Sequence, residues 1–87
     1  MKLTAELSLY PLREDFITPI LEFIEEICKN TNVVVATNSV STQITGEDDA
    51  VFDAIQLALR KSYEEFGSQV LVAKLIPKHF TDIGPKT

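Results

Sequence analysis

Residues 2–12 alternate strictly between apolar and polar side chains, and this alternation constrains the fold more than any other feature of the chain. Successive side chains of a β-strand point to opposite faces of its sheet. The leucines and the alanine at positions 3, 5, 7 and 9 therefore predict a core-facing side. The opposite side carries Thr4, Glu6, Ser8 and Tyr10. This polar row could bind a small cationic or polar ligand, or it could face solvent or another subunit.

The size and charge of the chain limit its function. A length of 87 residues suits one domain, and the eight basic residues are scattered along a chain of net charge −5, which argues against a nucleic-acid partner. No apolar run approaches the ~20 residues of a membrane span, and Glu6 interrupts any signal-peptide core. We therefore expect a cytoplasmic protein with no membrane insertion. The one cysteine, Cys28, excludes an internal disulfide, and we expect a buried packing thiol there.

A helix is predicted after the first strand, which Pro11 should end. Asp15 or Thr18 offers an N-cap for this helix, and Pro19 would then lie in its first turn, where proline is tolerated. Its apolar side chains recur at helical spacing, which predicts a buried stripe. The stripe comprises Phe16, Ile20, Phe23, Ile24 and Ile27.

Two short strands are predicted next, at residues 33–36 and 40–45, with a turn at 37–39 between them. Gly46 is expected to stop the second of these strands. The acidic residues 47–49 suit the positive end of a helix dipole and predict the start of a second helix. They lack the spaced oxygen ligands of a calcium loop, so we expect no metal site there.

The second helix is expected to end at Gly67, a residue type favoured just after a helix. A fourth strand is predicted over residues 69–76, and residues 79–87 read as a C-terminal tail that contains the single histidine, His79. We expect His79 to be a surface or interface residue, because no acid–base partner accompanies it. The predicted buried stripe of this helix comprises Val51, Phe52, Ile55, Leu59 and Phe66.

The element order βαββαβ predicts an α+β, ferredoxin-like sandwich over residues 1–78. Its antiparallel sheet would have the strand order 4-1-3-2, with both helices on one face and the other face open. Strands one and three would be central neighbours, which would bring Glu6 and Ser8 close to Ser41 and Gln43 on the open face.

Individual polar residues admit two interpretations each. Glu6 could accept a hydrogen bond from a ligand amine, or it could pair with Lys74 of the fourth strand. Tyr10 could stack on a flat ring or pack at the sheet edge. Thr42 shares the inward phase of Val40 and Ile44, so its hydroxyl needs a partner, either a nearby carbonyl or a ligand.

Several users of this fold are excluded by their missing motifs. The RNA-binding form needs aromatic residues on its central strands and basic flanks, and metallochaperones need a Cys-x-x-Cys loop. Arg13 and Asn38 faintly suggest the acylphosphatase loop, but its glycines are missing. No nucleophile–base pair is evident, so an enzyme is only a minor alternative.

Two segments resemble the YkoF-type thiamin/hydroxymethylpyrimidine-binding proteins and, more distantly, the single-domain thiamin-binding group. They are Ser8–Leu12, which follows the alternating strand, and Ser41–Asp48, which is followed by Val51 and Phe52. The resemblance implies the same fold, no cofactor, and non-catalytic binding of thiamin or its pyrimidine moiety in thiamin salvage or transport. It also implies a homodimer or homotetramer that associates through the sheet.

The resemblance places ligand contacts at Glu6, Ser8, Tyr10, Ser41 and Thr42. Two departures from the family pattern lie near the expected pocket mouth: Arg13 replaces a small residue, and Thr37-Asn38-Ser39 replaces a glycine-rich turn. We include Asn38 in the predicted site for this reason. The competing hypothesis is a regulatory or structural oligomerisation domain, because Val70 and Val72 would make the open face partly apolar.

Overall fold

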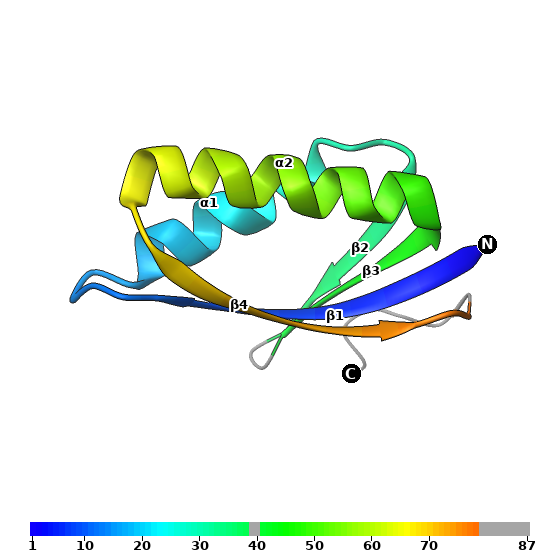
Figure 1. Ribbon diagram of the computed structural model, residues 1–87, viewed down its shortest axis with the longest axis horizontal. Coiled ribbons are helices and arrows are strands. Elements are labelled where there is room, and N and C mark those ends of the chain that lie inside the picture. Colours follow the sequence, from blue (N-terminus) through cyan, green and yellow to red (C-terminus); the bar gives the residue numbers. More distant parts are fainter. Residues whose placement is uncertain (39–40, 79–87) are drawn as a thin grey trace.

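The four strands form one antiparallel sheet in the order β2-β3-β1-β4, and both helices lie on the same side of it (Figure 1). The structure is a computed structural model that describes residues 1–38 and 41–78. This arrangement confirms the predicted ferredoxin-like α+β fold. The elements are β1 (Lys2–Pro11), α1 (Ile17–Cys28), β2 (Val33–Thr37), β3 (Thr42–Glu47), α2 (Asp48–Phe66) and β4 (Gln69–Ile76).

β1 is the structural centre, because it pairs with β3 along one edge and with β4 along the other. The apolar side chains of its alternating pattern are all buried beneath the helices, as predicted. They form a core with Phe23 and Ile27 from α1, Ile44 from β3 and Val51 from α2. No helix within residues 1–38 and 41–78 is long and apolar enough to cross a membrane.

The N-terminus of α1 lies between the two predicted capping residues, Asp15 and Thr18. Its N-cap is Phe16, which provides no side-chain hydrogen bond, so neither Asp15 nor Thr18 caps the helix. Pro19 lies in the first turn, as predicted. The expectation that Cys28 is buried is wrong, since this last helical residue is exposed. Ile27 takes the core-facing position instead. Successive residues of a helix are rotated by about 100°, so the Cys28 side chain points away from the core.

The buried stripe of α2 differs from the prediction. Val51 is buried, but Phe52 is 47% exposed. Ile55 and Leu59 are partly buried against the core, in line with the prediction. The fully buried side chains farther along the helix are small, namely Ala54, Ala58 and Ser62. Ala58 and Ser62 also line the hollow between α1 and α2, so these two buried positions face the neighbouring helix.

The two glycines that the sequence placed at element ends behave differently. Gly67 ends α2 with φ +83°, as predicted, and its N–H donates to the carbonyl of Tyr63. Gly46 does not stop β3, which continues to Glu47. A Cβ at Gly46 would lie 3.1 Å from the Asn32 carbonyl oxygen, so glycine is needed here for close approach of the β2 side.

The other boundaries follow the predictions closely. The fourth strand has the predicted bounds, and residues 47–49 form the N-cap and first turn of α2. The predicted inward phase of Thr42 and Ile44 is confirmed, since they lie opposite the core-facing residues Leu7 and Ala5 of β1. Three predictions lie outside the described residues: the start of the third strand at Val40, the tail at 79–87, and the surface position of His79.

The open face of the sheet combines a polar row with apolar residues. Glu6 lies opposite Gln43 on one side and Lys74 on the other, and its Oε1 is 3.6 Å from the Lys74 Nζ. The predicted ion pair is therefore present. Val34, Val70, Val72 and Ile76 are exposed near this row.

Candidate functional site

A hollow of about 390 Å³ lies where α1 passes the end of the sheet. The C-terminal half of β1 forms its floor, and the segment that leads into α1 forms one rim. The end of β2 and the start of β3 form the opposite rim, and one face of α1 forms a wall. Its volume falls in the range typical of small-molecule sites, about 300–1,000 Å³.

The lining of the hollow is mainly apolar, with a few polar groups. Described apolar residues of the lining are Leu7, Leu9, Pro11, Phe16, Ile20, Phe23 and Ile24. Hydroxyl and amide groups come from Ser8, Tyr10, Thr37, Asn38, Ser41 and Thr42. Arg13 is the one charged side chain among the described lining residues. Such a lining can hold a flat, largely apolar ligand and orient it through a few hydrogen bonds.

Five of the six predicted site residues line this one hollow: Ser8, Tyr10, Asn38, Ser41 and Thr42. They come from both faces of the sheet, because the hollow opens at its end. Ligand contact by these residues stays a prediction, but the fold brings them together from segments about 30 residues apart in the chain.

Glu6, the sixth predicted residue, is not part of the lining but is linked to it through Ser41. The Ser41 hydroxyl donates to Glu6 Oε2 at 3.2 Å and accepts from Gln43 Nε2 at 2.8 Å. Two partners fix the orientation of the Ser41 hydroxyl. The geometry thus gives Glu6 a role in positioning Ser41, whereas the sequence suggested direct contact with a ligand.

Asn38 and Ser41 are hydrogen-bonded to each other at the rim of the hollow. Asn38 Oδ1 accepts a hydrogen bond from the Ser41 N–H at 3.0 Å, and the Asn38 N–H donates to the Ser41 carbonyl at 3.1 Å. Such side-chain bonds to nearby backbone groups are typical of asparagine in turns. They hold the two polar side chains at fixed positions beside the hollow.

The buried hydroxyl of Thr42 has a different partner from the one predicted. It lies 3.2 Å from the Thr37 hydroxyl, which belongs to the residue directly opposite on β2. A hydroxyl can both donate and accept, so this cross-strand pair satisfies Thr42 without a carbonyl. Thr42 therefore has a protein partner before any ligand arrives.

Sequence reasoning missed the helical wall of the hollow. Phe16, Ile20 and Ile24 carry the helical spacing of a core stripe, so they were expected in the core. Phe16 is instead more than half exposed, and it precedes the helix. Ile20 packs against the core, as expected, and also lines the hollow. The available signal was the width of the apolar face: Pro19, Phe23 and Ile27 already fill the buried stripe, which leaves Ile24 for another surface.

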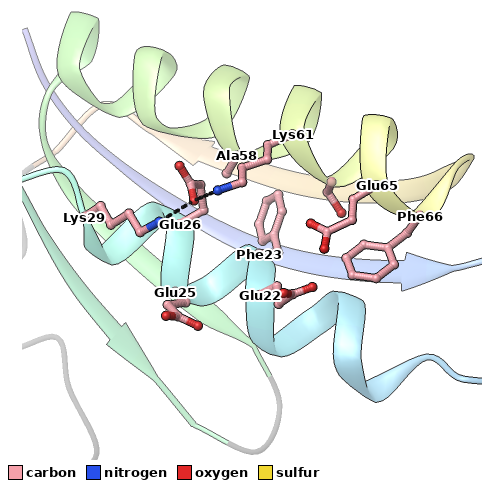
Figure 2. Close-up of a pocket in the computed structure, with 10 residues that line it drawn as sticks. Glu22, Phe23, Glu25, Glu26, Lys29, Ala58, Lys61, Glu65 and Phe66 are labelled. Carbon is pink, nitrogen blue, oxygen red and sulfur yellow. Dashed lines mark hydrogen bonds and ion pairs between the residues drawn. The ribbon is translucent and has the colours of Figure 1, made fainter.

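A second, smaller hollow of about 200 Å³ lies between α1 and α2 (Figure 2). Its rim is charged. Glu26 Oε2 contacts both Lys29 Nζ and Lys61 Nζ at 3.1 Å, which ties the two helices together. The hydrogen bond from Lys29, together with a smaller effect of the one from Lys61, holds the pKa of the Glu26 carboxyl below its ordinary value of 4.5. These contacts account for the polar rim as a link between helices, so the apolar hollow at the end of the sheet is the better candidate site.

We expect Glu26→Gln to lower stability at neutral pH and to lose this effect in acid. A carboxyl whose pKa is lowered in the folded state stabilises the protein above its unfolded-state pKa, and this contribution is lost as the pH falls through the folded-state pKa. The difference between wild type and variant should therefore shrink below about pH 4.5. Urea unfolding at pH 7 and in acid measures it.

The matched control for Glu26→Gln is Glu25→Gln, which removes the same charge from the exposed neighbouring position. We expect it to change stability less than Glu26→Gln at pH 7. Equal effects of the two variants at every pH would show that the link to Lys29 and Lys61 does not contribute, since exposed ion pairs are often worth little.

Solved structures of several proteins resemble this chain closely in fold. A candidate thiamine biosynthesis/salvage protein from Thermotoga maritima is 21% identical, with a TM-score of 0.79 over 90% of this chain and 85% of that one. A hypothetical protein from Methanocaldococcus jannaschii is 24% identical, with a TM-score of 0.76 over 94% and 84%. A protein from Streptococcus pneumoniae is 21% identical, with a TM-score of 0.81 over 95% and 93%.

At these identities the structural likeness shows the fold alone, and no curated protein has significant sequence similarity to this chain. A family model gives information beyond the fold: the model described as the YKOF-related family matches residues 2–75. This match covers both helices, all four strands except the last residue of β4, and the described lining of the hollow. The chain therefore belongs to the YKOF-related family.

Proposed function

We propose that this chain is a cytoplasmic homo-oligomer that binds thiamin or its hydroxymethylpyrimidine moiety without catalysing a reaction, in thiamin salvage or transport. The observation that carries the proposal is the apolar hollow at the end of the sheet, with five of the six predicted polar residues in its lining. Family membership supports it. The name of the Thermotoga relative, which refers to thiamine biosynthesis or salvage, points in the same direction.

The chemistry of the hollow suits an aminopyrimidine. The edge of this ring offers both donors and acceptors, and the side chains of Ser8, Asn38 and Ser41 can supply the complementary groups. Its faces are flat and apolar, and Tyr10 and Phe16 offer aromatic rings at the rim for stacking. Few polar groups on apolar walls orient a ligand while burial supplies most of the affinity.

Binding rather than catalysis fits the groups that surround the hollow. The described lining supplies hydroxyls, an amide and one guanidinium, and Glu6, the carboxylate that contacts Ser41, is paired with Lys74. Nucleophilic catalysis needs a nucleophile activated by an adjacent base that a third group orients. The Ser41–Glu6 contact at 3.2 Å lacks a histidine between the two groups, so we assign it to positioning.

A thermal-shift titration tests this function. Thiamin, hydroxymethylpyrimidine and thiamin phosphates would each be added over a wide concentration range, with a methylpyridinium salt as a control for cationic rings. We expect the melting temperature to rise with at least one thiamin-related ligand, because a ligand that binds only the folded state stabilises it by mass action. The absence of any shift up to millimolar ligand would contradict the proposal.

The alternative function is a regulatory or structural oligomerisation domain, and the exposed apolar residues of the open face favour it. Val34, Val70, Val72 and Ile76 lie on the sheet face opposite the helices. Exposed apolar groups beside a polar row are typical of protein interfaces. The two functions are compatible, since the hollow opens at the end of the sheet and on its helical side.

We expect Val72→Glu to weaken self-association through the open face. A carboxylate in an interface must lose its hydration, which is costly without a partner. Sedimentation velocity of the variant should show smaller particles than the wild type. Leu57→Glu is the matched control, because Leu57 is an exposed apolar residue of α2 on the other side of the molecule. A wild-type protein that sediments as a monomer with and without ligand would contradict the interface.

A further inference from the structure

Arg13 is the feature of the hollow that the proposed function leaves unexplained. It is the one charged side chain among the described lining residues, although the chain as a whole carries a net charge of −5. A cation at this position disfavours the bare thiazolium cation of thiamin, since like charges repel.

Phe66 holds the guanidinium of Arg13 in place. The Arg13 Cζ lies 5.4 Å from the centre of the Phe66 ring, at the C-terminal end of α2. Cations are attracted to the faces of aromatic rings at such distances. A guanidinium that lies over a ring face can still direct N–H groups toward a ligand, because the attraction to the ring does not require a hydrogen bond.

The guanidinium has no carboxylate partner within the described part of the chain. The ion pairs among residues 1–38 and 41–78 engage the N-terminus, Lys2, Lys29, Lys61 and Lys74, and Arg13 takes part in none of them. The guanidinium thus lies over an aromatic ring and forms no ion pair with a described acidic side chain.

We propose that Arg13 binds a phosphate monoester on the ligand and that the hollow selects phosphorylated over unphosphorylated forms. This inference rests on the proposed function and specifies its ligand class. The guanidinium can donate two parallel N–H bonds to phosphate oxygens, a geometry that an ammonium cannot match. The Ser8 hydroxyl also lines the hollow and can form a hydrogen bond with the ring.

Isothermal titration tests the proposal with two ligand pairs: hydroxymethylpyrimidine and its phosphate monoester, and thiamin and its monophosphate. We expect the wild type to bind each phosphate ester about tenfold to a hundredfold more tightly than the matching alcohol. In Arg13→Ala this preference should fall to about threefold or less, while affinity for the alcohols is kept or, for thiamin, increased. Arg13→Lys should retain only part of the preference.

Arg60→Ala is the matched control, because it removes the same charge from an exposed position of α2 that is not part of the hollow. It should leave the preference unchanged. An equal preference in wild type and Arg13→Ala, or no preference in the wild type, would overturn the inference while alcohol binding upheld the proposed function. If none of the four ligands binds the wild type, the proposed function fails, and the inference fails with it.

Discussion

Replacing Ile24 by tryptophan is expected to reduce ligand binding about a hundredfold or more while the protein stays folded, a loss of about 2.7 kcal/mol. Ile24 is half-buried on the face of α1 that lines the hollow, and it is not among the buried residues of the core. The larger indole can therefore extend into the hollow rather than into packed atoms. There it would occupy space that the ligand needs. Isothermal titration measures the loss.

Leu21→Trp is the control for this substitution. Leu21 lies on the same helix but is 60% exposed and is not a lining residue. The Leu21→Trp variant should bind ligand like the wild type, and circular dichroism should show the same helical content for both tryptophan variants. Unchanged affinity in Ile24→Trp would show that the ligand binds elsewhere on the protein.

Replacing Ile27 by alanine is expected to produce the largest loss of stability, about 2–5 kcal/mol. Ile27 is completely buried, and its side chain extends from α1 into the core between the helices and the sheet. The substitution removes buried methyl and methylene groups and leaves a cavity that its neighbours fill only in part. A domain of this size has a modest total stability, so the variant should be partly unfolded at 37 °C. Urea unfolding followed by circular dichroism measures the change.

The matched control is Leu21→Ala, which shortens a large apolar side chain on the exposed side of the same helix. We expect a change within about 0.5 kcal/mol, as is usual for surface substitutions. A similar loss in both variants would contradict the assignment of the Ile27→Ala loss to burial in the core, because alanine is at least as favourable in a helix as leucine or isoleucine.

The fold could be predicted from the sequence because its strands and helices carry different periods. The alternation in residues 2–12 identified β1 and its buried face, and the short connections restricted the topology to very few arrangements. The phase of β4 was less clear from the sequence, because both of its faces are largely apolar, but the ion pair of Lys74 with Glu6 that was one of the two interpretations of Glu6 is present. Period-based reasoning is dependable where a side chain's environment is set by its own strand or helix.

The prediction failed where a neighbouring element decides the environment. Cys28 is exposed and Phe52 is half exposed, because the contact between the two helices runs along other positions, including small residues such as Ala58. Apolar spacing cannot identify that contact, since alanine contributes little to an apolar pattern. Tertiary packing therefore has to be seen before buried stripes can be assigned on both helices.

The candidate site was predicted in part for the same reason. The motif residues of β1 and β3 were identified, but their position suggested a site on the open face. The hollow lies instead at the end of the sheet and includes Phe16 and Ile24 from the helical side. No single-element pattern reports a site that forms where a loop, a helix and strand ends meet.

The most direct test of ligand binding in this hollow is a titration of ¹⁵N-labelled protein with hydroxymethylpyrimidine and its phosphate ester, followed by amide chemical shifts. We expect the largest shifts at Ser8, Tyr10, Ile24 and Ser41, which line the hollow. Amides of Val34 and Thr45, on the open face away from it, should change little. Shifts concentrated at Val34 and Thr45, or no shifts at saturating ligand, would contradict the account.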